Sequence, residues 1–269
     1  MFSSFIFNTK KIIHLYIGFF RASLVADLEY RMNFTIRFFS DVFWYIAQIM
    51  TFEIIFMHTR IVGGWSIEQM RVFLSLIFIT DAIYMLLWHE NFNNLSEGVR
   101  RGELDLLLVK PINSQFMISS QRLATAYVGN LLLGVAWLFY TCYSLPQFNW
   151  LQLLWLLIML PAALSAIYLV RFFLNASSII FTRADFLQFL WYTIFRLGHR
   201  PDRIYQTAMR FVVLFVIPVG MIASAPARVI LEPPDWGIIL WALCMVPLVA
   251  LITNRYWNFC LSRYSSASS

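Results

Sequence analysis

The residues that could support catalysis are few and lie far apart in the sequence. His89 and Glu90 match the first two residues of the zinc-protease motif His-Glu-x-x-His. Position 93, where that motif needs its second histidine ligand, is Asn. The four histidines are scattered, the three cysteines lack metal-ligand spacing, and no Gly-x-Ser-x-Gly elbow offers a nucleophilic serine. We therefore expect no catalytic residue, metal or cofactor in this chain. Of the three functions that the sequence leaves open, that of an integral membrane enzyme is therefore the least favoured.

Asp81 is the ionisable residue whose position most needs an explanation. It lies in an apolar segment, residues 70–88, where a carboxylate is costly unless it faces protein or a water-filled path. Two roles remain open. Asp81 lines a translocation or proton path, or it is structural, being protonated or paired with a basic group on a neighbouring helix. Phe43, Phe52 and Phe78 could line an apolar vestibule on that path, although core or lipid contact also explains them.

A charged stretch between two long apolar segments, residues 100–111, is the most informative part of the sequence. Gly102 can end a helix, and Glu103 and Asp105 then place negative charge at the start of the next one. Three leucines share one face of this short helix, and Pro111 stops it. The pattern predicts a docking element. Its members are Arg100, Arg101, Gly102, Glu103, Leu104, Asp105, Leu107, Leu108, Lys110 and Pro111.

Residues 101–113 read Arg-Gly-Glu-Leu-Asp-Leu-Leu-Leu-Val-Lys-Pro-Ile-Asn, which resembles the loop signature of bacterial permease subunits in the type-2 ABC exporter superfamily. The C-terminal residues 263–269 resemble the way those chains end. The resemblance implies a bacterial inner membrane location, a second permease (identical or a sister chain), and a separate cytoplasmic ATPase subunit that holds ATP and Mg. Arg101, Glu103 and Asp105 would then make charged contacts with the ATPase, and the leucines would provide an apolar anchor.

Composition indicates that lipid is the solvent of this chain. Of its 269 residues 60% are hydrophobic and 13% are charged, and the mean hydropathy is +0.69. The 10 Trp and 12 Tyr suit two interfacial belts. The net charge of +6 fits basic loops that face anionic lipid, so we expect no nucleic-acid partner. Residues 1–269 are expected to form a single transmembrane domain.

The hydropathy pattern predicts an all-α integral membrane protein with about six transmembrane helices. Residues 92–115 would form the cytoplasmic coupling loop, and residues 184–201 a helix at the inner interface. Residues 226–235 would form a short helix or re-entrant loop at the outer surface, with Ser224 as a cap. The expected spans are residues 34–57, 70–88, 116–145, 151–181, 204–225 and 236–254.

Residues 1–33 are predicted to form an amphipathic helix along the inner leaflet, because polar and apolar residues separate at helical spacing. The polar side carries Lys10, His14, Gly18 and Arg21, and the apolar side carries Ile13, Phe19, Phe20 and Leu24.

The distribution of basic residues predicts that both termini are cytoplasmic. With Arg37 and Arg210 counted at the inner ends of their spans, the inner side holds 15 of the 20 Lys and Arg, five of them between residues 183 and 210, and the outer loops hold only Arg60 and Arg228. Arg122 and Arg171 lie near the inner interface, where their side chains are expected to extend towards water.

The favoured function is that of the permease subunit of an ATP-driven exporter. The alternative is a secondary transporter or lipid scramblase that works without ATP. Such proteins favour several intramembrane charges and inverted repeats, whereas this chain has one convincing midplane charge and no visible repeat. The transported substrate is not indicated by the sequence.

Overall fold

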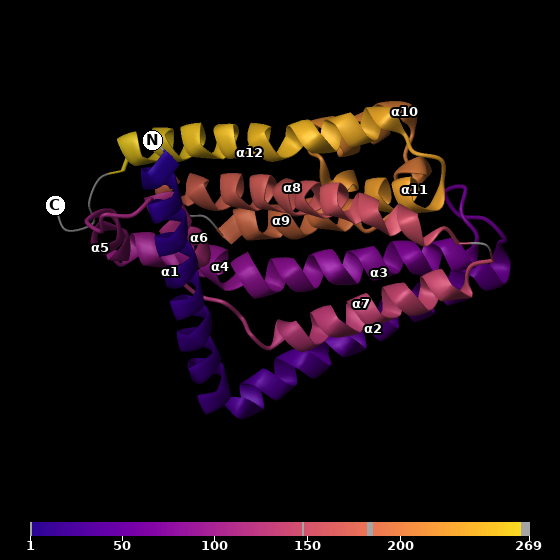
Figure 1. The fold of residues 1–269 in the computed structure, drawn as a ribbon, viewed down its shortest axis with the longest axis horizontal. Helices are drawn as coiled ribbons and strands as arrows, with labels where there is room; N and C mark the ends of the chain where they lie inside the picture. Colours follow the sequence, from indigo (N-terminus) through magenta and orange to yellow (C-terminus); the bar gives the residue numbers. More distant parts are fainter. Residues whose placement is uncertain (1, 147, 182–184, 265–269) are drawn as a thin grey trace.

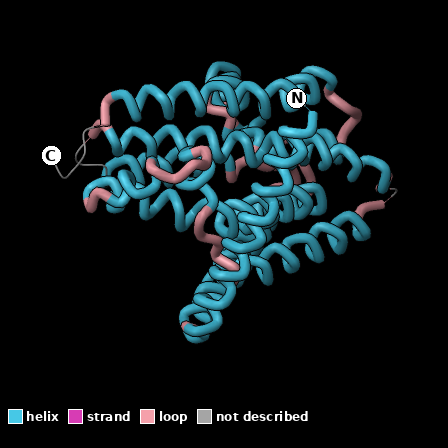
Figure 2. The backbone as a smooth tube through the Cα atoms, turned by 60° about the vertical axis from the view of Figure 1, so that its left-hand side comes forward, coloured by secondary structure: helices cyan, strands magenta, loops and turns pink. Residues whose placement is uncertain are grey.

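The computed structural model describes residues 2–146, 148–181 and 185–264, with side chains from Ile12 onward except that of Asp185. Long helices lie side by side, and short helices and turns close both ends of the bundle (Figures 1 and 2). Within the described ranges the chain is helical, and strand-like pairing is limited to a single bridge between Val62 and Trp65. The predicted all-α class is confirmed for these residues.

Twelve α-helices occur among the described residues. A π-helical turn, Met85–His89, joins α3 to α4, so Ile67–Arg100 is one uninterrupted helical stretch. The α-helices are α1 Phe2–Glu29, α2 Arg31–His58, α3 Ile67–Tyr84, α4 Glu90–Arg100, α5 Glu103–Leu108, α6 Ser114–Ser120, α7 Tyr127–Ser144, α8 Leu156–Ala176, α9 Asp185–Gly198, α10 Thr207–Phe211, α11 Ser224–Leu231 and α12 Trp236–Ser262.

Several helices are long and apolar enough to cross a membrane, which makes this a multi-pass membrane protein. Four such stretches occur among the described residues: Arg31–His58, Ile67–Arg100, Trp150–Ile179 and Trp236–Ser262. The 18-residue α7 runs alongside α3. These four stretches contain most of the predicted spans 34–57, 70–88, 151–181 and 236–254.

Helix α3 is the centre of the bundle. Most of its side chains are buried, and α2, α7, α8 and α11 pack around it. Gly134 of α7 permits the closest approach, because a Cβ atom there would lie 3.3 Å from the backbone nitrogen of Ile79. Tyr45 of α2 stacks on Phe78 of α3 with ring centroids 4.2 Å apart. Close packing against these neighbouring helices gives α3 its fixed position.

The two ends of the bundle differ, and we name each by one residue. The Gly102 end carries α4, α5 and α6, and the Asp202 end carries α11 and the turns before α3 and α12 (Figure 1). Pro201 belongs to the Asp202 end, because a Cβ atom on Gly63, in the turn before α3, would lie 2.9 Å from Pro201 Cβ.

The predicted fifth span, residues 204–225, is wrong. This segment is broken into α10, a π-helical turn Val212–Val216, a 3-10 turn Val219–Met221 and the start of α11. The preceding helix α9 runs alongside α8 from the Gly102 end towards the Asp202 end (Figure 1), so residues 185–198 do not form an interfacial helix. Pro218 explains the break, because proline cannot donate the hydrogen bond that would continue the helix.

Three other boundaries differ from prediction. The second span does not end at residue 88, because Phe92 is fully buried within the continuing helix. The third span is interrupted at residues 121–126, where the chain turns between α6 and α7. The last helix continues to Ser262. In each case packing against neighbours, rather than hydropathy, decides where the helix ends.

The count of basic residues also needs correction. Arg200, Arg203 and Arg210, which we assigned to the inner side, follow α9 and lie at the Asp202 end. Arg183 and residues 265–269 of the predicted cytoplasmic tail lie outside the described residues. The cytoplasmic location of the termini therefore stays a prediction.

Helix α1 runs across the Gly102 end of the bundle instead of along it (Figure 1). The carboxylate of Asp27 accepts hydrogen bonds from the backbone nitrogen and hydroxyl of Thr125, at 2.8 and 2.6 Å. Ser23 Oγ accepts from the backbone nitrogen of Leu123 at 3.0 Å. Phe19 and Phe20 are half-buried while Ile13 is exposed, and the Lys10 side chain lies outside the described part. These contacts fix the α1 helix against the α6–α7 turn.

Candidate functional site

The predicted docking residues form a helical hairpin at the Gly102 end. Gly102 has a φ of +74°, a left-handed conformation that glycine adopts without steric cost, and it separates α4 from α5. Glu103 and Asp105 occupy the first turn of α5, where the helix dipole favours negative charge. The helix ends at Leu108, before the predicted stop at Pro111. Gly102 therefore sets the angle at which α5 is presented.

Leu104 anchors α5 to its own chain. Its side chain is 1% exposed and belongs to an apolar cluster with Phe92 and Leu95 of α4, Ile118 of α6 and Trp257 of α12. Leu107 packs against the same cluster. The predicted apolar face of α5 thus exists, but Leu104 and Leu107 turn it towards the bundle instead of towards a partner. The cluster joins the hairpin to the C-terminal part of α12.

The most exposed apolar residues of the hairpin are two that the sequence analysis did not select. Leu106 is 71% exposed and Val109 is 84% exposed, whereas Leu108 is only 36% exposed. Helical spacing predicts which residues of α5 share a face. Which face is buried against the rest of the chain depends on where α4 and α6 lie. Lys110 and Pro111 follow this surface and are also exposed.

Glu97 is a third residue that the sequence analysis missed. It forms ion pairs with Arg100 and with Arg101, the latter at 2.9 Å, and all three side chains remain largely exposed. The pairs join residues three and four positions apart on α4, which is the spacing that brings helical side chains together. The arginines are therefore orientated along α4 and still accessible from water.

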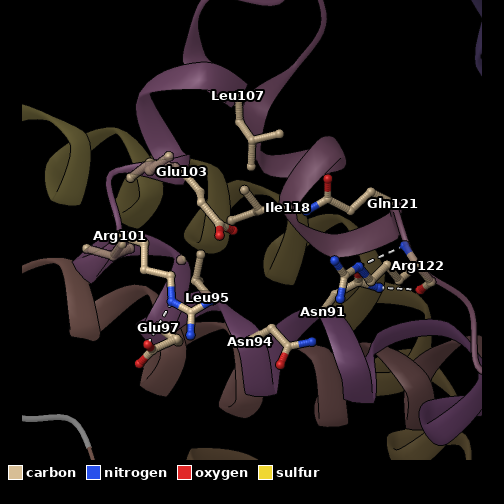
Figure 3. A pocket seen from close by; sticks show the side chains of 13 residues that line it. Asn91, Asn94, Leu95, Glu97, Arg101, Glu103, Leu107, Ile118, Gln121 and Arg122 are labelled. Carbon is tan, nitrogen blue, oxygen red and sulfur yellow. Dashed lines mark hydrogen bonds and ion pairs between the residues drawn. The ribbon is translucent and has the colours of Figure 1, made fainter.

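A cavity of about 220 Å³ opens between α4, α5 and α6. Figure 3 shows Glu103 on one side of this cavity and Arg122 on the other, with Asn94 of α4 below and Leu107 above. Asn91 bridges α4 to the α6–α7 turn, donating to the carbonyl of Arg122 at 2.6 Å and accepting from its backbone nitrogen at 3.0 Å. The lining combines carboxylates, guanidinium groups and several apolar side chains, which suits a protruding side chain of another protein.

The predicted path residues are only partly brought together, because Phe52 and Phe78 share one core cluster and Phe43 lies outside it. Phe52 and Phe78 are buried in the core with 8% and 2% exposure, whereas Phe43 is 70% exposed on α2. Asp81 is buried, and it interacts electrostatically with Asp41 of α2 instead of forming an ion pair with a basic residue in the described chain. Asn130 of α7 donates to Asp41 at 2.9 Å. The role of these phenylalanines in a path therefore stays a prediction.

Arg171 does not extend to water as predicted. It is 1% exposed, donates to Asn93 of α4, and lies over the ring of Trp191 with its guanidinium carbon 5.4 Å from the centroid. Asn93, which stands where a zinc helix would have histidine, contacts His89 Nε2 at 2.8 Å. Arg171 therefore ties α8 to α4 and α9, and His89 belongs to this structural network.

Comparison with known proteins places the chain in a family. The model of a family described as ABC-2 family transporter protein matches residues 42–268, which is most of the chain. The chain belongs to the ABC-2 transporter family. It is a membrane-embedded permease component of an ABC transporter. No curated protein and no solved structure gave a significant match. Helix α1 and the start of α2 lie outside the matched range, whereas the hairpin at Gly102 lies inside it.

Proposed function

We propose that this ABC-2 permease is one half of the translocation path of an exporter in a bacterial inner membrane, driven by a separate cytoplasmic ATPase subunit. The ATPase would bind ATP and Mg, and it would dock on the Gly102 end. The observation that carries this proposal is the hairpin itself: α5 is anchored from inside by Leu104 while its other face, with Leu106 and Val109, is exposed beside a charged cavity.

Movement of a docked ATPase would reach the membrane helices through α4. Helix α4 continues α3 without a break, so displacement of the hairpin is transmitted along one rigid rod to the centre of the bundle. Glu90, at the start of α4, forms an ion pair with Arg37 of α2. A second connection runs from Asn93 to Arg171 of α8. Three spans are thereby joined to the docking element by polar contacts or by continuous helix.

A second permease copy or a sister chain would complete the path. Helix α2 exposes an apolar stripe whose members recur at helical spacing, and most of this helix is not covered by its own chain. The stripe consists of Ile36, Phe39, Phe43, Ile46, Met50, Ile54 and Met57. Phe43 could thus line a path between two subunits, and Asp81 with Asp41 remains the candidate polar element beside it. The alternative is an ATP-independent transporter, in which the carboxylates of Asp81 and Asp41 would form part of the path.

The test is co-purification from native membranes through a tag on this chain. The decisive variant is Leu106→Glu with Val109→Glu, because both side chains are exposed and their replacement leaves the bundle intact. Glu103→Lys with Asp105→Lys tests the predicted charged contacts. The matched control is Glu29→Lys, an exposed charge reversal on α1. We expect an ATPase subunit to accompany the wild type and the control but not the hairpin variants.

Two other outcomes have definite meanings. Recovery of the ATPase with every variant at equal yield would keep the exporter and move its docking site away from the hairpin. Absence of any ATPase from repeated gentle purifications would favour the ATP-independent transporter, and transport assays of Asp81→Asn would then be the next experiment.

A further inference from the structure

A lateral groove lies between α8, α12 and α6. Two neighbouring cavities of about 590 and 470 Å³ share Trp88, Asn113, Gln115 and Tyr168 in their linings and so form one continuous groove. Two of its walls, α8 and α12, belong to helical stretches long and apolar enough to span the membrane. It is separate from the cavity at the hairpin, with which it shares no lining residue.

The groove changes from apolar to polar along the membrane normal. Pro161 and Leu164 on α8, with Val246 on α12, form its apolar part. Towards the Gly102 end they give way to Thr253 and Asn254, which lie about 10 to 12 Å from Val246 by helical rise. A single membrane lipid has the same order of groups, with its acyl chain towards the bilayer centre and its headgroup at the interface.

The polar part of the groove is held in place by hydrogen bonds. Gln115 Nε2 donates to Tyr168 Oη at 3.2 Å and to Thr253 Oγ1 at 3.0 Å. Ser119 Oγ lies 2.9 Å from Tyr168 Oη, and Thr253 Oγ1 donates to the carbonyl of Val249 at 2.8 Å. These bonds fix the Gln115 amide, whose Oε1 atom and the Asn254 side chain have no recorded partner within the described residues. Amide groups in such positions can bond hydroxyl groups of a ligand.

The lining of the larger cavity contains no Asp, Glu, Lys, Arg or His among the described residues. A phosphate-bearing headgroup would therefore lose water without gaining a cation, which costs free energy in a low-dielectric site. A headgroup of neutral hydroxyls has no such cost and can use the amides.

We propose that this groove binds one lipid of the leaflet at the Gly102 end, with an uncharged, hydroxyl-bearing headgroup such as that of a glycosyl diacylglycerol. The sugar lies against Gln115 and Asn254, and one acyl chain lies between Pro161 on α8 and Val246 on α12. Lipid binding at this groove requires no ATPase, so the inference goes beyond the proposed function. An experiment can support or contradict it independently of ATPase docking.

The test uses the full-length chain, purified with whatever subunits accompany it, in nanodiscs of phosphatidylglycerol. The probe is glucosyl diacylglycerol with a diazirine in one acyl chain, compared with phosphatidylglycerol that carries the same chain. After illumination, labelled peptides are identified and quantified by mass spectrometry. Ala250→Trp fills the apolar part of the groove, and Leu251→Trp places the same side chain at a neighbouring residue that is 50% exposed and outside the groove lining.

We expect the glucosyl lipid to label peptides containing residues 161–168 and 246–254, and the labelling to be lost in Ala250→Trp but kept in Leu251→Trp. Gln115→Leu should reduce labelling by the glucosyl lipid about fivefold, the effect of losing one neutral hydrogen bond, without affecting phosphatidylglycerol. Equal labelling by both lipids, labelling that survives Ala250→Trp, or protection of this face by a second copy of the chain would each overturn the proposal.

Discussion

The two ends of the bundle use charge in opposite ways. At the Gly102 end, Glu97 pairs with arginines three and four residues away, and all three side chains are largely exposed. At the Asp202 end, the Asp202 side chain is completely buried and accepts from Arg210 Nε at 2.6 Å and from Ser224 Oγ at 2.5 Å. The first arrangement is local and open to water, and the second joins segments distant in sequence.

A second set of contacts strengthens the Asp202 end. Glu232 accepts from Trp65 Nε1 at 2.8 Å and from Arg203 at 2.5 Å, which joins the turn before α3 to the turn before α12. Arg228 bridges Asp202 and Asp235, at 3.4 and 3.1 Å. The contrast suggests that one end holds the fold together, while the other presents charged and apolar groups that the fold itself does not need. The predictions below test that contrast.

The largest expected effect is that of Asp202→Ala. The substitution leaves Arg210 and Arg228 without their common buried partner, and removal of one member of a buried ion pair costs about 3–5 kcal/mol. We expect a large fall in the apparent melting temperature of the purified protein. The same measurement on Glu29→Ala, at an exposed carboxylate, supplies the control. Equal stability of the two variants would mean that the Asp202 cluster does not hold the fold together.

Leu104→Ala should have the next largest effect, because it empties a buried site between α4, α5 and α6. Large-to-small substitutions in packed cores cost about 2–5 kcal/mol. The matched control is Leu106→Ala, which removes the same group from the exposed side of the same helix and should leave the melting temperature unchanged. ATPase recovery should fall in both variants if the hairpin docks the ATPase. Similar melting temperatures for both would contradict the assignment of Leu104 as the internal anchor.

The sequence allowed prediction of features that depend on neighbours along the chain. The long apolar run of α2, the glycine hinge at Gly102 and the acidic first turn of α5 all follow from local composition. Residues 204–225 could not be interpreted in the same way. Their apolar residues resemble a span, but Arg210 lies at the end of the bundle because it pairs with Asp202, and hydropathy does not record such pairing.

The sequence also did not allow prediction of the surroundings of buried polar residues in the bundle. Arg171 seemed free to reach water because its own helix places it near an interface, yet Asn93 and Trp191 from two other helices surround it. For the candidate site, helical spacing correctly grouped Leu104 with Leu107, but it also included Leu108, which is exposed and lies outside the apolar cluster. It could not tell whether that set faces the chain or a partner, since the answer depends on where α6 lies.

Gly102→Ala should have an intermediate effect. The residue has a left-handed backbone conformation that costs an L-residue about 1–2 kcal/mol, and its strain would change the direction of α5. We expect reduced ATPase recovery with only a small change in melting temperature. Gly102→Asn is the matched control, because asparagine tolerates this conformation better than alanine does. If alanine and asparagine behave alike, the orientation of the hairpin does not depend on the backbone at this position.

The smallest effect is expected from the ion pairs of the Gly102 end, and a comparison of two double-mutant cycles would show it. The cycle of Glu97→Gln and Arg101→Gln should give no measurable coupling in melting temperature, because both side chains are largely exposed and neighbours on one helix. The cycle of Glu232→Gln and Arg203→Gln should give clear coupling, because that pair is less exposed and joins residues 29 positions apart. ATPase recovery should show the reverse order, with loss only in the first cycle. Equal coupling at both ends would remove the contrast, because the Gly102 end would then be as much a part of the fold as the Asp202 end.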